Sequence, residues 1–176
     1  MLYKVIEEDD YFGTFHVRTR HLHKLREVLL SKIPIVAVDK ITILHNTSGM
    51  QDDVLKHRIS LVPVTQICGN LYLKKKGSCD VVTDHFTSDG PVMMKDVLLL
   101  HLAKNQSVEL KATCSEGIGH AKHAALCNFY WEALETDVYR VKIESVGQCK
   151  PSEIMRVASE ILQQDSQQRT EPQNRI

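Results

Sequence analysis

The sequence predicts an α+β fold, in which a small antiparallel sheet is combined with two amphipathic helices. Two kinds of pattern support this prediction. Apolar and polar side chains alternate over residues 108–114, as they do in a strand with one buried face. Over residues 22–33 and 154–162, apolar residues recur every three or four positions, as they do along the buried face of a helix. Apolar residues make up 43% of the 176 positions, which is enough to build a sizeable core.

The N-terminal half contains most of the predicted elements. Two short strands over residues 3–7 and 14–18 are joined by an acidic turn. A helix over 21–33 ends before Pro34, because proline disfavours the helical conformation in the residue that precedes it. The further elements are strands over 35–38 and 41–44, a short helix over 52–59 and an extended stretch over 61–64.

The rest of the chain shows little regular pattern between residues 65 and 105. Within it, three consecutive lysines at 74–76 precede Gly77 and predict a solvated hairpin tip. A second alternating strand covers 141–146, and a last helix covers 151–162, where Pro151 suits the first turn. The segment that follows is rich in glutamine and has no periodic apolar residue. We therefore expect a disordered tail, which we place at residues 166–176.

Charge and hydropathy restrict the class of protein. The chain has 22 Lys and Arg against 22 Asp and Glu, whereas a protein that grips nucleic acid by itself usually carries a basic excess. This balance favours protein partners, with little or no direct nucleic-acid contact. Charged residues crowd the first ten positions, and no apolar run is long enough to span a bilayer. We expect a soluble, intracellular protein of the nucleus, the cytoplasm or a virion, without a membrane partner.

The cysteines and histidines raise an alternative function. Five cysteines without a secretory signal are expected to be reduced thiols. Cys114, His120, His123 and Cys127 together would be a chemically adequate zinc set, although their spacing is not a common zinc pattern. The alternative is thus a stand-alone, zinc-stabilised protein-binding module. In the simpler interpretation, the two cysteines are small buried hydrophobes and no metal is bound.

The sequence offers no signature of a catalyst. Nothing marks any cysteine as an activated nucleophile, and no aspartate-rich triplet is present that would hold a catalytic magnesium ion. We therefore predict no catalytic residue and no cofactor, and a structural rather than an enzymatic role.

Four segments, in this order, carry a resemblance to a known family. They read LREVLLSKIP followed by VAVD at 25–39, DVLKHRISLVPV at 53–64, CSEGIG at 114–119, and KIESVG with PSEI at 142–154. Together they resemble the assembly subunits of DNA-directed RNA polymerases, a family that includes the bacterial alpha subunit, the archaeal D-type subunit and the eukaryotic third subunit. The His-Arg pair followed by Leu-Val-Pro is the most specific of these matches. The resemblance covers roughly residues 21–162.

The chain also departs from the family pattern. Arg26 is followed by Glu27, where the family usually has a second arginine. The family's His-Ala-Lys triplet is represented either by His120, which comes early, or by His123, which comes late, and the sequence leaves both possibilities open. The clustered cysteines of some relatives are absent. These features are typical of a shortened, divergent member, such as one from a large DNA virus.

The resemblance implies a discontinuous layout and a scaffold function. Residues 1–36 and 137–165 would form a dimerisation domain, and residues 37–136 an inserted, mostly β domain. The chain would pair with a small partner subunit of the eukaryotic eleventh-subunit or archaeal L type, and the pair would dock the large catalytic subunits. A domain of this size is marginal alone, so we expect its apolar stripes to need the partner.

The resemblance also indicates which residues to examine. The expected heterodimer interface comprises Leu22, Leu25, Val28, Leu29, Ile33, Ile154, Val157, Ala158 and Ile161. The expected docking residues for the large subunits are Asp53, His57, Arg58, Gly117, Gly119 and His123.

Overall fold

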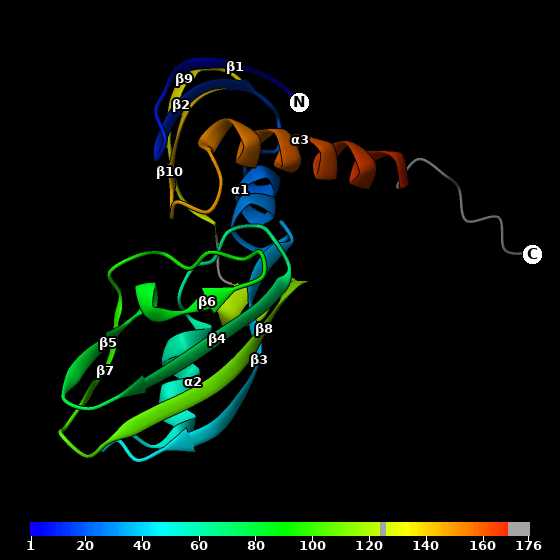
Figure 1. Cartoon of the computed structure of the whole chain (residues 1–176). Helices are drawn as coiled ribbons and strands as arrows, with labels where there is room; N and C mark the ends of the chain where they lie inside the picture. Colours follow the sequence, from blue (N-terminus) through cyan, green and yellow to red (C-terminus); the bar gives the residue numbers. More distant parts are fainter. Residues whose placement is uncertain (124–125, 169–176) are drawn as a thin grey trace, which may run out of the picture. The chain divides into compact units, whose positions relative to one another are not determined.

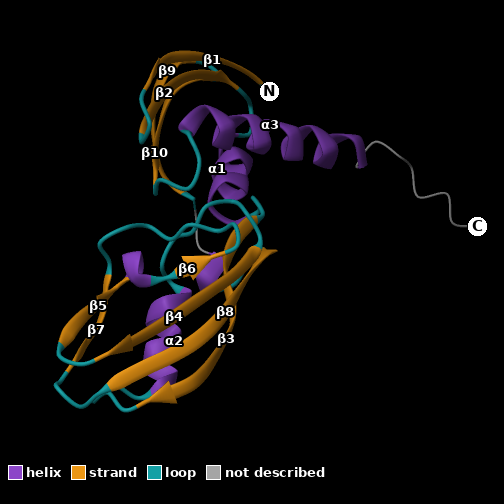
Figure 2. Ribbon diagram, in the orientation of Figure 1, coloured by secondary structure: helices purple, strands orange, loops and turns teal. Residues whose placement is uncertain are grey.

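A computed structural model describes residues 1–123 and 126–168 (Figure 1). The chain divides into two compact units: a first unit of Met1–Ile33 and Ala124–Ile176, and a second unit of Pro34–His123. Within the described ranges, no helix is both long and apolar enough to cross a membrane. Figure 2 distinguishes the helices, strands and loops of both units.

The first unit is a four-stranded antiparallel sheet with two helices. The strands lie in the order β1 (Leu2–Glu8), β2 (Phe12–Arg18), β10 (Val138–Ser145) and β9 (Cys127–Glu135). The helices are α1 (Leu22–Ser31) and α3 (Pro151–Gln168), which contact each other. Segments from both ends of the chain therefore share one core. Gly13 of β2 permits this closeness, because a Cβ there would lie only 2.5 Å from the Cβ of Pro151.

The second unit is mostly β. Its main sheet has the order β3 (Ile35–Asn46), β8 (Ser107–Gly117), β4 (Gly69–Lys76) and β6 (Thr87–Ser88). A separate strand pair is formed by β5 (Cys79–Val82) and β7 (Leu98–Leu102). Helix α2 (Asp52–Ser60) and two 3₁₀ turns, η1 (Thr83–His85) and η2 (Ala121–His123), complete the unit.

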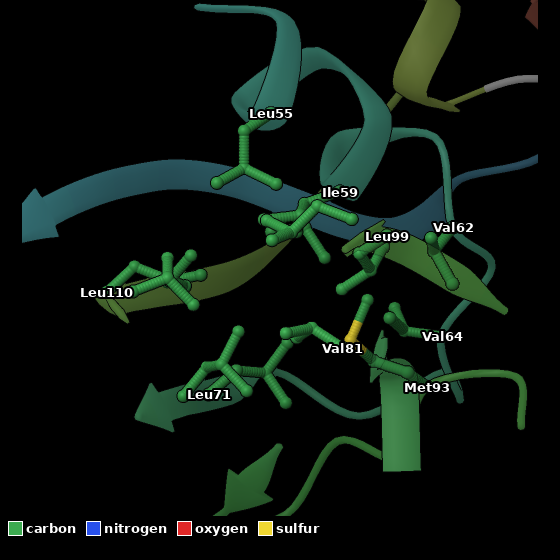
Figure 3. Close-up of a cluster of buried hydrophobic side chains, with 14 of the residues drawn as sticks. Leu55, Ile59, Val62, Val64, Leu71, Val81, Met93, Leu99 and Leu110 are labelled. Carbon is green, nitrogen blue, oxygen red and sulfur yellow. The ribbon is translucent and has the colours of Figure 1, made fainter. Parts of the chain in front are cut away.

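The core of the second unit joins helix α2 to both sets of strands. Leu55 and Ile59 of α2 are fully buried in one apolar cluster with Leu71, Leu99 and Leu110 of the strands. Figure 3 shows these side chains converging beneath the helix. Polar residues alternate with the buried ones along β8, so one face of the main sheet packs on this core and the other is exposed.

The predicted α+β fold class, with antiparallel sheets, is confirmed. Three local predictions differ from the structure. The two strands expected over 35–44 are one strand, β3, whose register shifts at two irregular positions. The lysines at 74–76 end β4 at a turn, but β5 pairs with β7, so this turn does not close a hairpin. The stretch at 61–64 makes only an isolated bridge, between Val64 and Met93.

The domain limits also differ at the second boundary. We expected the inserted region to run to residue 136, whereas the second unit ends at His123 and β9 belongs to the first unit. Helix α3 continues to Gln168, so the predicted disordered tail is wrong for residues 166–168. The rest of that tail, residues 169–176, lies outside the described residues.

Candidate functional site

The two helices of the first unit pack on one face of its sheet. Phe15 and Val17 of β2 and Val141 and Ile143 of β10 are buried on that face. The side chains that cover them come from both helices, namely Leu25, Val28 and Leu29 of α1 and Ile154, Met155 and Ala158 of α3. This arrangement gives the first unit an apolar core of its own.

This packing revises the predicted heterodimer interface. Six of the nine expected residues are buried within the chain itself, and these are Leu25, Val28, Leu29, Ile33, Ile154 and Ala158. A side chain that is already covered cannot touch a second polypeptide, so these six residues belong to the core of the first unit rather than to its surface. The other three, Leu22, Val157 and Ile161, are only half-buried and remain accessible along the flanks of the helices.

The helix-bearing face is not fully covered at the β9 edge. Trp131 of β9 pairs with Val141 of β10, so both side chains point to the same face. Val141 is buried, whereas Trp131 is 54% exposed. The indole meets the ring of Tyr139 edge-on, with ring centroids 5.8 Å apart. The exposed Trp131 and the half-buried Tyr139 thus continue the apolar core to the edge of the sheet.

The opposite edge of the same face is also open. Val5 of β1 pairs with Phe15, and Phe15 pairs with Val141, which pairs with Trp131. These four residues form one row across the sheet, with a buried centre and exposed ends, since Val5 is 41% exposed. We call the accessible apolar residues of this face and its helices the open face: Val5, Leu22, Trp131, Tyr139, Val157 and Ile161.

A charged cavity lies between the two helices. It has a volume of about 530 Å³, and its lining includes Lys24, Glu27, Lys32 and Asp165. The Lys32 ammonium lies 3.2 Å from Glu27 and 3.5 Å from Asp165, so it links α1 to the C-terminal half of α3. The hydrogen bond and charge of Glu27, followed by those of Asp165, raise the pKa of Lys32. The cavity therefore places charged side chains beside the apolar residues of the helices.

Trp131 is a residue that our sequence reasoning missed, because we placed it inside the inserted region. A signal was present. Cys127, Phe129 and Trp131 alternate with the more polar Asn128, Tyr130 and Glu132, which is the pattern of a strand with one apolar face.

The expected docking residues lie on two segments of the second unit. On α2, Asp53 and His57 are exposed, and Asp53 lies 3.6 Å from Lys56. The Arg58 guanidinium donates a hydrogen bond of 2.9 Å to the carbonyl oxygen of Leu98. Arg58 therefore ties α2 to β7, although it is exposed like Asp53 and His57.

The other segment is the loop from Gly117 to His123. His123 is 91% buried, its ring lies against Gly117, and neither ring nitrogen has a hydrogen-bond partner among the described residues. Gly119 is exposed and has a φ of 81°, a conformation that favours glycine. His123 therefore shapes the loop from inside, and of the predicted loop residues Gly119 is the most accessible.

An ion pair holds the same loop to the main sheet. Lys122 contacts the carboxylate of Asp39 on β3. The hydrogen bonds from Lys122 and Ser115 lower the pKa of Asp39. Of the two histidines between which the sequence could not choose, His120 is exposed and only His123 is packed into the fold.

The alternative zinc site has no support in the structure. No cluster of three or more metal-binding side chains occurs within residues 1–123 and 126–168. Cys114 belongs to the second unit and Cys127 to the first. Burial raises the pKa of the Cys114 thiol to about 11 and that of the Cys127 thiol to about 12, so both are protonated near neutral pH. They act as buried apolar side chains.

Comparison with known proteins decides the family. Residues 20–166 match the model of the RNA polymerase Rpb3/Rpb11 dimerisation domain. The chain belongs to this family. The match covers α1, both boundaries of the second unit and most of α3, so it contains the helices and strands that form the open face, apart from β1 and β2. The predicted family is confirmed.

Archaeal relatives agree with this membership. The chain is 30% identical to DNA-directed RNA polymerase subunit Rpo3 of Methanocaldococcus jannaschii over 147 residues, 78% of this chain and 76% of the relative. It is 28% identical to Rpo3 of Pyrobaculum aerophilum over 158 residues, 72% of this chain and 61% of the relative. A shorter stretch of 40 residues is 45% identical to a subunit of RNA polymerases I and III of Dictyostelium discoideum.

These comparisons confirm the predicted class of this family member. The chain is a structural subunit of an enzyme complex, a DNA-directed RNA polymerase, rather than a catalyst in its own right. Membership of this family implies an intracellular location. The chain spans about three quarters of the Methanocaldococcus protein but less than two thirds of the Pyrobaculum protein.

Proposed function

We propose that the chain is the non-catalytic assembly subunit that founds a multisubunit DNA-directed RNA polymerase. In this proposal, the first unit pairs with a small subunit of the eukaryotic eleventh-subunit or archaeal L type. The second unit then docks the large catalytic subunits. The match to a dimerisation domain supports pairing in general, and the open face supports its location.

The observation that carries the proposal is the row from Val5 to Trp131. A sheet face that is apolar from edge to edge, but covered only at its centre, is complementary to a second apolar surface. Fully burying a large apolar side chain contributes about 1.5–3 kcal/mol. Of the open-face residues, Val5 and Trp131 are about half exposed, whereas the other four are only partly exposed. Covering them would contribute on the order of 5 kcal/mol, which is enough to favour association when the polar rim is also matched.

The partner is expected to lie across the helices as well as the sheet edge. Leu22 begins α1, whereas Val157 and Ile161 are one turn apart on α3 and face the same side of that helix. A helix pair from the small subunit that packed against these three residues would also shield the charged cavity beside them. The six buried residues of the original prediction fix the positions of α1 and α3 from beneath.

Docking of the large subunits is proposed for the second unit. Asp53 and His57 of α2 and Gly119 of the loop are the accessible candidates. Arg58, Gly117 and His123 hold these segments in shape, through the Leu98 carbonyl and through the contact between the glycine and the imidazole ring. The contact is expected to be with protein, with little or no direct contribution from nucleic acid.

Co-purification of the chain with the small subunit tests the proposal. Trp131→Ser should reduce recovery of the 1:1 complex, and Tyr130→Ser is the matched control. Tyr130 is 56% exposed, almost as much as Trp131, but it neighbours Trp131 in the strand and so points to the other face of the sheet. Both variants remove an exposed aromatic side chain, so their intrinsic effects on folding should be similar.

The two variants give opposite results if the open face is the interface. The wild-type chain and the Tyr130→Ser variant should yield a soluble 1:1 complex, and Trp131→Ser should lose most of it. Equal recovery from both variants would place the interface elsewhere. A wild-type chain that stays a monodisperse monomer in the presence of the small subunit would contradict the proposal itself.

A further inference from the structure

The exposed face of the main sheet in the second unit carries a line of lysines. On this face, Lys40 of β3 lies opposite Thr113 of β8, and Lys111 of β8 lies opposite Tyr72 of β4. Thr113, Lys111 and Tyr72 point away from the apolar core, because the residues that alternate with them along β8 and β4 are buried. Lys40 points the same way, because it pairs directly with Thr113. The face is accessible, and only Tyr72 among these residues is partly covered.

The strand register arranges the lysines diagonally. Lys40 pairs with Thr113, and Lys111 lies two residues before Thr113 on β8. Lys111 pairs with Tyr72, and Lys74 lies two residues after Tyr72 on β4. Diagonal neighbours of this kind lie about 7–8 Å apart in a sheet. Lys76 continues the line, two residues further along β4. Four lysine positions thus follow one another across β3, β8 and β4 at nearly even backbone spacing.

Only one of these charges is neutralised within the described part of the chain. Lys74 lies 2.8 Å from a Glu109 carboxylate oxygen, and the Tyr72 hydroxyl donates to the other oxygen of that carboxylate at 2.7 Å. These two partners lower the pKa of Glu109. Asp89 accepts hydrogen bonds from the backbone N–H and the side-chain amide of Asn70 on β4. Lys40 and Lys111 have no acidic partner within hydrogen-bonding distance among the described residues.

A shallow groove runs between these two lysines. Its lining includes Lys40, Thr42, Asn70, Tyr72, Lys111 and Thr113, and its volume is about 490 Å³. The threonine and asparagine side chains offer both hydrogen-bond donors and acceptors beside the free ammonium groups. The groove therefore combines positive charge with neutral polar groups, and it suits a ligand that is anionic and itself polar.

We propose that this face binds an acidic segment of a partner protein in an extended conformation. In an extended peptide, alternate side chains leave on the same side about 6.8 Å apart, close to the spacing of the lysine line. A segment with Asp or Glu at every second position would place successive carboxylates along the line, while its other side chains would face solvent. These carboxylates would lie over the three lysines that are unpaired within the described ranges, Lys40, Lys111 and Lys76, and over Lys74 between them.

A single-stranded nucleic acid fits this face less well. Such strands are held largely by bases that stack on successive aromatic side chains. Tyr72 is the only aromatic residue in the lysine-lined groove, and its hydroxyl is already bonded to Glu109. The lysines could attract phosphates, but the bases would have no row of rings to stack on. The observations therefore favour a peptide.

Fluorescence anisotropy with the full chain tests the proposal. The probe is a labelled synthetic peptide of alternating glutamate and threonine, about eight residues long, so that it crosses the three strands at about 3.4 Å per residue. The charge-free probe of alternating glutamine and threonine should not bind. Replacing Lys40 and Lys111 together by Gln should weaken binding of the acidic probe by about fivefold, as expected for two exposed ion pairs.

A matched double variant separates a site from general attraction. Lys95→Gln with Lys104→Gln removes the same charge from exposed positions of the second unit that lie off this face, and should change binding by less than about twofold. Replacing Lys40 and Lys111 by Arg should retain binding. Equal losses in the two Gln variants, no binding of the acidic probe, or tighter binding of a single-stranded oligonucleotide of the same charge would each overturn the proposal.

Discussion

The imidazole ring of His123 occupies the space into which a side chain at position 117 would project, and Gly117 is the residue that leaves this space empty. The two residues lie at the ends of the loop that we propose as part of the docking surface. Because the ring is buried and its nitrogens have no partner among the described residues, steric fit rather than hydrogen bonding fixes its position.

Gly117→Ala should therefore disturb the second unit. The new methyl group would overlap the imidazole, and overpacking of this kind typically costs about 1–3 kcal/mol of unfolding free energy. Urea unfolding measures this cost. Gly49→Ala is the control, because a Cβ at that position meets nothing within 4 Å, and it should be close to neutral.

The double variant identifies the cause. In a chain that already carries His123→Ala, the Gly117→Ala substitution should cost much less, because the ring that it would strike is gone. Equal costs of Gly117→Ala in the two backgrounds would show that the contact between Gly117 and His123 does not determine the stability of the loop.

Leu25 and Ile161 should respond differently to a new charge. Leu25 is fully buried in the core of the first unit, so Leu25→Asp should destabilise folding by at least about 3 kcal/mol and remove pairing as a consequence. Ile161 is half-buried, so Ile161→Glu should change stability by less than about 1 kcal/mol but weaken pairing with the small subunit roughly tenfold.

Thermal unfolding and a pairing assay on the same preparations separate these effects. Gln164→Glu adds the same charge at an exposed position of the same helix that does not line the charged cavity, and should leave both properties unchanged. The assignment of Ile161 to the interface fails if Ile161→Glu pairs as well as Gln164→Glu does.

The cysteines should react with thiol reagents in an order set by burial. Cys68 is exposed, whereas Cys114 and Cys127 are buried and have pKa values raised to about 11 and about 12. A raised thiol pKa lowers the thiolate fraction at every pH below it, so the two buried cysteines should stay unmodified at about pH 8 in the native chain.

Mass spectrometry after brief alkylation checks this order. Cys114 and Cys127 should be labelled only when denaturant is added, and a chelator should not change the result. If a chelator without denaturant allowed these two cysteines to be alkylated, a metal would have to be protecting them, and this result would support the zinc site.

Much of the first unit could be predicted because its apolar spacing is local. The stripe that contains Leu25 and Val28, and the alternation that contains Val141 and Ile143, each report the buried face of one element. The length of α3 was underestimated, because its last turns carry no apolar stripe and their helical conformation is not signalled by periodicity.

Which apolar residues the chain covers by itself could not be predicted from the sequence. The apolar residues of α1 would have the same spacing whether the helix packed on its own sheet or on a partner. Periodicity predicts that one face is buried, but not which surface covers it. Val5 and Trp131 are placed at the ends of one row only by the register of four strands. The sequence of a single strand does not indicate which distant strand it pairs with.

The docking residues show the same limit. His57 and Arg58 are adjacent in the motif and both are exposed, yet the Arg58 guanidinium also donates a hydrogen bond to the carbonyl oxygen of Leu98, forty residues further along the chain. The motif identified the segment correctly as part of the family pattern. It could not tell which of the two side chains also makes a contact within the fold.

The fluorescence of Trp131 tests the central claim most directly, because it is the only tryptophan in the chain. Its indole is 54% exposed, so its emission should move to shorter wavelength when the partner covers the open face. The measurement is a titration with a small subunit whose own tryptophans have been replaced by phenylalanine. A blue shift that saturates at one partner per chain is the predicted result, whereas a 1:1 complex that forms with unchanged Trp131 emission would contradict the proposed interface.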